Sequence, residues 1–509
     1  MTEGDTDGTS QTGSDDGSSF VEYGIEDEPP LSTSVLLGVQ HYLTMVGANI
    51  AVPLILAGAM GMPAGVTAKF VGTFFVVSGI ATLAQTTFGN RYPIVQGAPF
   101  SMLAPALAIV ATAPTLPGGV AWESKLLFLQ GAIIAAATTE VFIGYLGIVG
   151  RLRRLLSPVV VAPTIALIGL SLFNVPQITA PDQNWWLLGL TVGLVVLFSQ
   201  YLGDGHRVFQ LFPVLLAIVL SWLVAAGLSV TGVLASGTKG YVDLASVTDV
   251  ELVFAIYPLQ WGMPRFEAAF AIGMFAGVLA SIVESFGDYH AVARLTGSGA
   301  PSESRINHGI GMEGLMNVFA GIMGAGGSTS YSENIGAIGL TGVASRRVVQ
   351  VGAAVMLVVG FFGPFGQLIA TIPAPIVGGL FVAMFGQIVA VGLSNLEYVD
   401  LDSSRNVFVI GIALFTGLAI PNYMNGLEGV AALKEGLAGI AVLGPVLGTD
   451  PVANTLFVIG GTGMAVGGLV ALLLDNTIPG TDEERGVAAW EDVAEDESDF
   501  SPVWAAADD

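Results

Sequence analysis

The chain of 509 residues has no cysteine and few charged residues of either sign. Without cysteine it has no disulfide framework, no thiolate metal site and no cysteine nucleophile. Charged residues make up 11% of the chain and apolar residues 53%, whereas a soluble domain carries about 25% charged residues. So little charge cannot cover a surface in water, and the sequence therefore predicts an integral membrane protein. With only four histidines and no motif such as His-Glu-x-x-His, we expect no metal site, no cofactor and no enzyme.

Most of the net charge of −24 lies at the two ends of the chain. Residues 1–30 hold nine acids and no Lys or Arg, and the stretch from Asp475 to the end holds twelve acids with Arg485 as its one base. We interpret 1–30 and 476–509 as disordered acidic cytoplasmic tails. Together with twelve Arg against four Lys, they indicate a salt-adapted, halophilic-archaeon-like cytoplasm in which salt screens the repulsion. A general solubilising role is the alternative.

Apolar runs separated by Gly, Pro, Asn and charged residues predict fourteen membrane spans. They lie near 34–57, 67–87, 92–112, 125–148, 156–173, 185–202, 209–228, 266–286, 308–325, 328–344, 347–371, 374–394, 406–421 and 453–475. Seven spans fall in 31–228 and seven in 266–475, on either side of an extracellular loop at 229–265. With both termini in the cytoplasm, eleven Lys and Arg fall inside and five outside, as the positive-inside rule requires. We therefore expect a multi-pass protein of the cell membrane.

The third span of each half is interrupted at its start. Residues 91–100 and 326–336 are too polar and too rich in Gly and Pro to open a spanning helix. Each predicts a few extended residues followed by a half-helix, with Pro99 in a first helical turn and Asn334 as a cap. Non-helical backbone at membrane depth is tolerated only where protein buries it or where it lines a cavity. Two such segments at equivalent positions predict a transport site at the midplane; two merely kinked spans are the alternative.

Several ionisable residues lie within predicted spans, where they are costly and mark candidate sites. They are Gln40-His41 in the first span, Glu140 in the fourth, Glu284 and Asp288 at the end of the eighth, Glu313 in the ninth and Glu333 in the tenth. Because these spans hold no Lys or Arg to neutralise the acids, at least one acid is expected to bind a proton or face a cation. Glu284 and Glu333 predict a pocket for a neutral ligand with several N–H donors, since an anion would require Arg, Lys or free helix N-termini.

Structural roles remain open for the other residues of this set. Asp288 and Glu313 could instead tie helices together, and for Glu140 the two interpretations are equally consistent with the sequence. His41 is better explained as an interhelical hydrogen-bond partner than as a direct ligand. Phe100, beside the first interruption, could stack on a flat ring or could only pack against neighbouring helices.

The motif Glu333-Asn-Ile-Gly336-Ala-Ile-Gly-Leu-Thr341 resembles the signature of the nucleobase-ascorbate transporters, also called the nucleobase:cation symporter-2 or xanthine/uracil permease family. Gln40-His41, Glu284 with Asp288, and Glu313-Gly314 extend this likeness, which covers roughly residues 31–475. The resemblance implies an all-α membrane protein built as a seven-plus-seven inverted repeat. Spans 1–4 and 8–11 would form a core, spans 5–7 and 12–14 a gate that builds a homodimer, and the starts of spans 3 and 10 two short antiparallel strands.

The same resemblance implies a function and roles for individual residues. The substrate-binding residues would be Phe100, Ala98, Glu284, Tyr331, Ser332, Glu333 and Asn334, with the two glutamates on the edges of the base and Phe100 on its ring. The residues that support coupling would be Gln40, His41, Asp288, Glu313 and Thr341. The protein would be a secondary active importer of a nucleobase, uracil or a purine such as xanthine, with H⁺ or Na⁺, through an elevator-like shift of the core.

Two departures from the family pattern bear on the substrate. Many members have Gly-Ser-Phe or Thr-Ser-Phe where this chain has Ala98-Pro99-Phe100, which removes a serine contact. Residues 284–295, 345–350 and 392–406 are similar to the animal ascorbate branch, but that branch carries Pro where Glu333 stands, and the charge of Glu333 would repel an ascorbate anion. Asp288, in place of the His of uracil carriers, favours purines. Ascorbate or another organic anion, and an anion exchanger or channel on the same architecture, are the alternatives.

Overall fold

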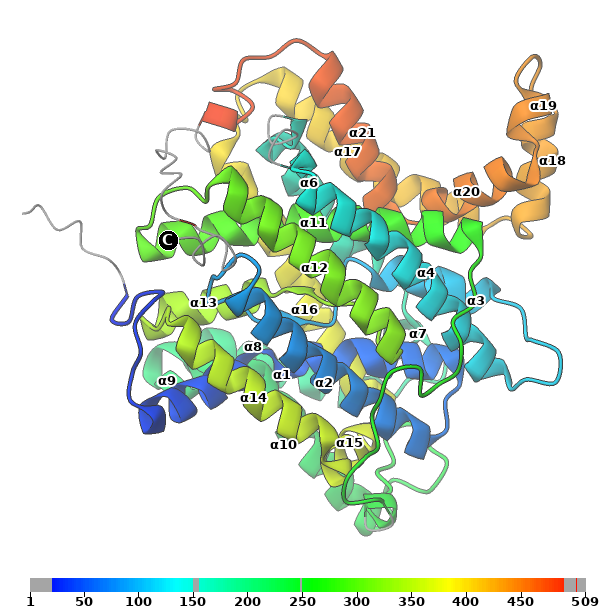
Figure 1. The fold of residues 1–509 in the computed structure, drawn as a ribbon. Helices are drawn as coiled ribbons and strands as arrows, with labels where there is room; N and C mark the ends of the chain where they lie inside the picture. Colours follow the sequence, from blue (N-terminus) through cyan, green and yellow to red (C-terminus); the bar gives the residue numbers. More distant parts are fainter. Residues whose placement is uncertain (1–20, 150–154, 248–249, 489–499, 501–509) are drawn as a thin grey trace, which may run out of the picture.

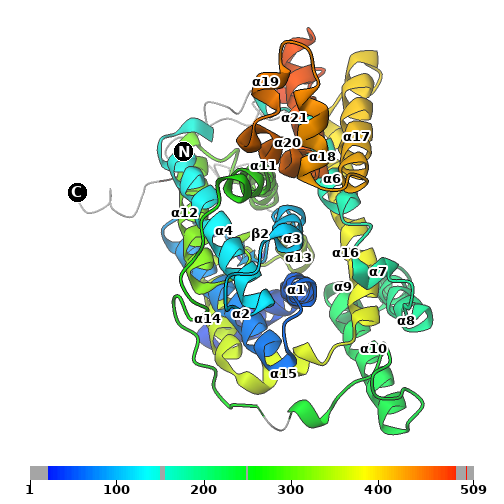
Figure 2. The ribbon, with the colours of Figure 1, turned by 90° about the vertical axis from the view of Figure 1, so that its right-hand side faces the viewer.

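The structure is a computed structural model that describes residues 21–149, 155–247, 250–488 and Phe500. Its helices pack into two groups that lie side by side, as Figures 1 and 2 show. The core group is α1 (Leu31–Met60), α2 (Ala64–Thr87), α3 (Leu103–Thr112), α4 (Ala121–Tyr145), α11 (Ala268–Thr296), α12 (Glu303–Met323), α13 (Ser332–Thr341), α14 (Arg346–Phe361) and α15 (Gly363–Ala370). Within it α2 packs on α14 and α15, and α4 packs on α11 and α12.

The flanking group holds the remaining helices. They are α6 (Pro158–Ser171), α7 (Pro176–Thr179), α8 (Trp185–Val196), α9 (Arg207–Leu211), α10 (Pro213–Val230), α16 (Ala374–Ser394), α17 (Ser404–Asn425), α18 (Val430–Ala438), α19 (Gly444–Leu447), α20 (Asp450–Gly460) and α21 (Gly463–Thr477). Short 3₁₀ or π turns lie at Leu197–Tyr201, Gly203–Gly205, Ala245–Val247 and Asn395–Tyr398. Here α6 packs on α16, α17 and α21, and α8 packs on α10 and α16.

Membrane-spanning character is clear for part of the helices. Among the described residues, six helices are long and apolar enough to cross a bilayer, and two bent pairs raise that number to eight. Each of the fourteen predicted ranges contains a helix, but several of these helices are too short to cross alone, so the number of fourteen spans stays a prediction. Burial differs within the set: 78% of the most apolar window of α2 is buried against 22% for α17. The apolar surface of α2 therefore faces protein, and that of α17 is left for lipid or another chain.

Two broken segments cross within the core group. β1 (Gln96–Gly97) pairs with β2 (Thr329–Ser330) in antiparallel register, with Gln96 opposite Ser330. Both strands are buried, and each is followed by a helix of ten residues, α3 or α13. The two segments singled out from the sequence thus each consist of a short strand and a half-helix, and they meet at the strands.

The residues expected to begin these half-helices do not do so. Pro99 lies before α3, which begins only at Leu103, because a turn at residues 100–102 intervenes. Asn334 is the third residue of α13, and Tyr331 is its N-cap residue. The side chain of Asn334 instead accepts a hydrogen bond from the backbone N–H of Val95, 2.8 Å away, across the two segments. A tertiary contact therefore takes the place of the local cap.

The helix of the predicted eighth span continues beyond the predicted end of that span near residue 286. α11 continues to Thr296 and ends at Gly297, which has a left-handed conformation with φ 65°. Gly287 alone does not break the helix, and the next glycine that can adopt positive φ is Gly297. Glu284 and Asp288 consequently lie inside one continuous helix, one turn apart.

Parts of the expected disordered tails are ordered in the structure. Glu26 forms ion pairs with Arg346 and, at 3.7 Å, with Arg91. Near the other end, Arg485 pairs at 2.8 Å with the buried carboxylate of Asp475, which Arg405 also contacts at 2.9 Å. Composition alone could not show that these acidic stretches meet arginines elsewhere in the chain. Residues 1–20, 489–499 and 501–509 lie outside the described residues, so the expectation of disorder stays a prediction for them.

The close packing of α4 on α12 depends on Gly314. We therefore predict that a larger residue at this position lowers the stability of the protein. A Cβ atom at Gly314 would lie 2.6 Å from the backbone nitrogen of Val141. Gly314→Ala must therefore push the two helices apart, and we expect it to cost about 1–3 kcal/mol. Thermal unfolding of the detergent-solubilised protein should show a lower midpoint. Gly287→Ala is the matched control, because no heavy atom lies within 4 Å of its added Cβ; equal midpoints for the two variants would contradict the packing argument.

Candidate functional site

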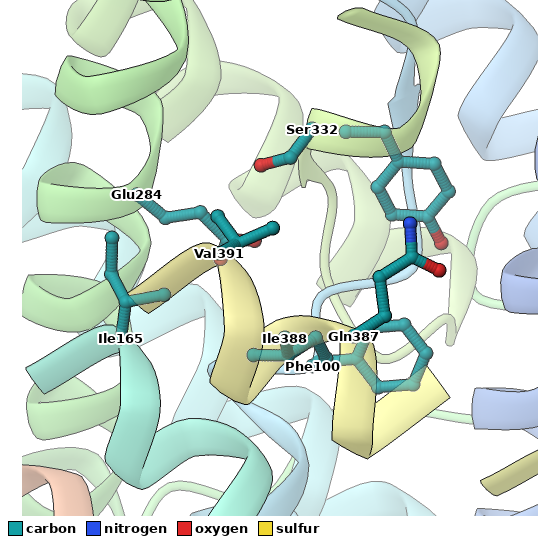
Figure 3. A pocket seen from close by; sticks show the side chains of 8 residues that line it. Phe100, Ile165, Glu284, Ser332, Gln387, Ile388 and Val391 are labelled. Carbon is teal, nitrogen blue, oxygen red and sulfur yellow. The ribbon is translucent and has the colours of Figure 1, made fainter. Parts of the chain in front are cut away.

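A cavity lies at the boundary between the core group and the flanking group (Figure 3). The cavity itself has a volume of about 40 Å³, and the atom-free space around it, which includes open solvent, amounts to about 430 Å³. From the core group it is lined by Phe100, Glu284, Tyr331 and Ser332, and from the flanking group by Ile165, Gln387, Ile388 and Val391. Because its two walls belong to different helix groups, a shift of one group against the other would change the shape of the cavity.

Glu284 and Ser332 bring polar groups to this cavity from two different elements. Glu284 lies on α11, and Ser332 is the first residue of α13. Figure 3 shows the side chains of both residues directed toward the same space. The N-terminal end of a helix carries a partial positive charge and free N–H groups. The cavity thus combines a hydrogen-bond acceptor on α11 with the donor end of α13.

Phe100 and Tyr331 form an aromatic part of the wall and are held by neighbouring contacts. The ring of Phe100 packs edge-on against Phe385 of α16, with 5.9 Å between ring centroids. The hydroxyl of Tyr331 donates to the carbonyl oxygen of Ala98 at 2.9 Å, and the N–H of Ala98 donates to the side chain of Asn49 at 3.1 Å. Ala98 is therefore a buried support for Tyr331 and does not line the cavity itself.

Asp288 lies directly behind the cavity, one helical turn after Glu284. The hydroxyl of Ser332 donates to Oδ1 of Asp288 at 2.6 Å, and the hydroxyl of Ser330 donates to Oδ2 at 2.5 Å. Asp288 itself is 5% exposed. Ser332 both lines the cavity and binds Asp288, so one hydroxyl group connects this carboxylate to the cavity wall.

Glu313 of α12 forms a second buried carboxylate centre. It accepts hydrogen bonds from the hydroxyls of Ser281 at 2.7 Å, Ser285 at 2.5 Å and Thr329 at 3.0 Å. Ser285 is also 2.9 Å from the hydroxyl of Ser330, which joins this centre to Asp288. Hydroxyl groups can donate to a carboxylate and can also accept from a protonated one. The arrangement can therefore accommodate the gain or loss of a proton without rebuilding the helices.

Glu140 of α4 extends the same buried polar layer. Nδ2 of Asn317 donates to Glu140 at 2.9 Å, and Oδ1 of Asn317 accepts from the backbone N–H of Ser328 at 2.6 Å. This contact ties α4 to the strand segment through α12. Glu140 is fully buried and is not among the described residues that line the cavity, so its position fits a structural role.

The remaining residues of the expected coupling set are not all near one another. The ring nitrogen Nδ1 of His41 lies 3.0 Å from the side-chain nitrogen Nδ2 of Asn334, so His41 connects α1 to α13. The hydroxyl of Thr341 donates to the carbonyl of Ala337 within α13. Gln40 and Thr341 do not line the cavity, and Thr341 forms contacts local to the helix end.

Glu333 is the second residue of α13 and follows the cavity-lining Ser332. Its side chain lies outside the described part of the structure. The convergence of Glu284 and Glu333 on one ligand therefore stays a prediction, and only the backbone position of Glu333, at the start of the half-helix, is established.

The sequence did not lead us to the cavity-lining residues of the flanking group, or to the hydroxyl groups that bind the buried acids. Gln387 stands alone among apolar residues of α16, and a polar residue within a span is a signal that could have found it. Ser281, Ser285 and Asp288 recur at four and three residues, which places them on one face of a helix. That spacing could have identified the hydroxyl side of the network.

Known proteins similar to this chain include transporters. A family model described as a permease family matches residues 32–426. The chain is 43% identical over 509 residues to Solute carrier family 23 member 2 of Rattus norvegicus, covering 92% of this chain and 76% of that protein. It is 35% identical over 520 residues to Nucleobase-ascorbate transporter 12 of Arabidopsis thaliana, covering 93% and 72%.

Two solved structures share the fold. One is the murine Solute Carrier 26 family member A9 anion transporter in the inward-facing state, with a TM-score of 0.60, 13% identity, and coverage of 77% of this chain and 66% of that chain. The other is the transmembrane domain of the cyanobacterial bicarbonate transporter BicA, with a TM-score of 0.51, 18% identity, and coverage of 77% and 100%. At such identities the likeness shows a common architecture and not a common substrate.

Proposed function

The chain belongs to the nucleobase-ascorbate transporter family of membrane permeases, and we propose that within this family it imports a neutral nucleobase together with H⁺ or Na⁺. Family membership makes the protein a transporter and not an enzyme. The proposed substrates are uracil or a purine such as xanthine, carried across the cell membrane.

One observation carries the choice of a neutral base. The described residues that line the cavity include the carboxylate of Glu284 and no Arg, Lys or His. A carboxylate accepts hydrogen bonds from ring N–H groups, whereas it repels an anion at close range. Phe100 offers an apolar face to a flat ring, and the backbone N–H groups at the start of α13 offer donors to a carbonyl oxygen. These groups together match the donors and acceptors on the edge of a nucleobase.

Ascorbate is the second candidate. The name of the Arabidopsis relative includes both substrates, and the identity to Solute carrier family 23 member 2 spans most of this chain. An anion exchanger is disfavoured, because the likeness to the Solute Carrier 26 member shows the fold alone and the described cavity lining has no cationic side chain.

The placement of the site supports an elevator-type mechanism. The polar groups that would hold the base lie on the core group, while the opposite wall from the flanking group is mainly aliphatic, with Ile165, Ile388 and Val391. A base bound to the core group could therefore move with it while sliding past the flanking group, which would act as the gate. We further propose that two copies associate through the flanking group, as the apolar surface of α17 allows, and that both termini are cytoplasmic.

Coupling would run through Asp288 and Glu313. Cation or proton binding at this network would change the hydrogen bonds of Ser332, which reaches the cavity. If cation and base together permit the core group to move while the cation alone does not, the two fluxes are linked. His41 would support α13 through Asn334.

Uptake into proteoliposomes tests this proposal. Purified protein is given labelled xanthine, uracil or ascorbate under a pH gradient or a Na⁺ gradient, each imposed separately. We expect saturable accumulation of a nucleobase with one of the two gradients and no accumulation of ascorbate. Ascorbate uptake without uptake of any base would overturn the assignment and leave the second candidate.

Two measurements on the same vesicles distinguish a role of Asp288 in coupling from a role in substrate binding. Asp288→Asn should remove gradient-driven accumulation, whereas exchange of internal unlabelled base for external labelled base should persist, because exchange needs no net movement of the cation. Loss of both activities with substrate binding retained would place Asp288 outside the coupling step.

A further inference from the structure

Residues 21–28 lie immediately before α1 and run beside the loop that joins α13 to α14 (Figure 1). Tyr23 forms a parallel bridge with Val343 in that loop. The loop follows the half-helix whose first residue, Ser332, lines the cavity. A half-helix of ten residues is about 15 Å long, so the segment contacts the same rigid element as the substrate, at its opposite end.

The loop between α13 and α14 is buried and takes its backbone partners from this segment. Val343 and Ala344 are 3% and 0% exposed. The N–H of Ala344 donates to the carbonyl of Tyr23 at 2.8 Å, and the carbonyl of Gly342 accepts from the N–H of Tyr23 at 3.1 Å and of Glu22 at 2.7 Å. Buried backbone groups need such partners, since leaving them unpaired is costly. Without the segment the loop would have to open to water or rearrange.

Two further contacts fix the start of α14. The N–H of Arg346 donates to the carbonyl of Ile25 at 3.1 Å. The hydroxyl of Ser345 donates to the carbonyl of Asp27 at 2.6 Å and also caps α14 by accepting from Val348. The segment therefore holds both the end of α13 and the beginning of α14.

Glu26 links this region to the other broken segment. Its carboxylate pairs with Arg346 at the start of α14 and lies 3.7 Å from Arg91, which precedes β1. The pKa of Arg91 is lowered by burial and by the nearby charge of Arg346, and Glu26 opposes this effect. An acid at this position thus stabilises two arginines that would otherwise repel each other.

Buried hydrogen bonds link α13, whose far end the segment holds, to the residues beside β1. Nδ1 of His41 lies 3.0 Å from the side-chain nitrogen of Asn334 on α13, and Oδ1 of Asn334 accepts from the backbone N–H of Val95 next to β1. Through α13, the loop is therefore connected to both broken segments.

We propose that residues 21–28, which we call the N-terminal clasp, are a positioning element of the substrate site. They hold the far end of α13 and connect it to the start of the first broken segment, so that Ser332 stays in place at the cavity. The clasp contacts no cavity-lining residue in the hydrogen bonds described above, and its effect on substrate runs through α13. This proposal rests on the proposed function only where its test measures transport of the substrate.

Two truncations of the full chain test the clasp. Removal of residues 1–20 should leave the KM for the transported substrate unchanged. Removal of residues 1–28 should raise KM by roughly tenfold, the change expected when one or two buried hydrogen bonds are lost, with a smaller effect on the maximal rate per folded transporter. A folded 1–28 deletion with the KM of the intact protein would overturn the proposal.

A point variant decides the matter if the longer deletion does not fold. Tyr23→Pro removes the N–H that donates to Gly342, whereas Tyr23→Phe keeps it and serves as the matched control. We expect a raised KM for the proline variant alone. A lower melting temperature of Tyr23→Pro with an unchanged KM would reduce the clasp to a stability element and refute a positioning role.

Hydrogen exchange gives a readout that needs no substrate. Amides of residues 332–346 should exchange faster in Tyr23→Pro than in Tyr23→Phe, while those of α17 in the flanking group should not change. If the intact protein transports no nucleobase, the proposed function fails, yet this comparison still tests the clasp. Equal exchange in the two variants would contradict it.

Discussion

Glu284→Gln is expected to abolish concentrative uptake of the nucleobase, with an initial rate lowered by roughly 10- to 100-fold or more. Hydrogen bonds to a charged partner contribute about 1.5–3 kcal/mol, and each 1.4 kcal/mol is about a factor of ten in affinity. Glutamine has nearly the same shape, but it can place an N–H₂ donor where the base also presents a donor. The variant thus removes the attraction and can add an unpaired buried group.

The measurement is the initial rate of labelled base uptake, together with binding to the detergent-solubilised protein. Glu435→Gln is the matched control, because Glu435 is an exposed acid on α18, far along the chain from the cavity lining. Monodisperse Glu284→Gln protein should fail to bind the base. Full binding and uptake by this variant would show that the cavity at Glu284 is not the substrate site.

The sequence could predict the two broken segments and the importance of α11, and the reasons are local. Gly, Pro and polar residues at the start of two apolar runs cannot open a spanning helix, so an extended piece must precede each half-helix. Glu284 and Asp288 are one turn apart in any helix, whatever its partners. Both features depend only on neighbours in the sequence, and the structure contains them.

The features that the sequence could not predict are made by distant residues. Asn334 was expected to cap α13, yet its side chain binds the backbone of Val95, more than two hundred positions away. Ser332 was expected only among the substrate-binding residues, and in the structure its hydroxyl donates to Asp288. Gln387 is a polar residue within a predicted span, which marks it as a candidate, but nothing near it in the sequence relates α16 to α11. Which polar groups share a cavity is decided by packing between the helix groups.

The two acids of α11 lie in different surroundings, which fits different roles for them. Glu284 lines the cavity, whereas Asp288 lies behind it and accepts hydrogen bonds from the hydroxyls of Ser330 and Ser332. In the proposed mechanism one helix would carry a group for the substrate and a group for the coupling ion, separated by a single turn of about 5.4 Å. Because Ser332 touches Asp288 and lines the cavity, occupancy at one acid can be sensed at the other without movement of the helix.

Glu333 should decide between a base and an anion as substrate. Glu333→Gln is expected to weaken nucleobase uptake by roughly tenfold or more, through loss of a charged hydrogen bond. Glu333→Pro is a sharper variant, since the position is the second residue of α13 and proline is tolerated in the first turn of a helix. If Glu333 binds the base as the family resemblance implies, its removal also relieves repulsion of an anion, about 4 kcal/mol at 4 Å for an effective dielectric constant of about 20.

The experiment compares uptake of labelled xanthine and ascorbate by the intact protein, Glu333→Pro and Glu333→Asp. We expect the proline variant to lose xanthine uptake and to take up ascorbate faster than the intact protein, because one of the two acids that would repel an anion is then removed. The aspartate variant keeps the charge and should still exclude ascorbate, although a shorter side chain weakens its contact with the base. Ascorbate uptake by the intact protein at the rate of the proline variant would mean that the charge at residue 333 does not select the substrate, and it would favour the ascorbate candidate for the whole chain.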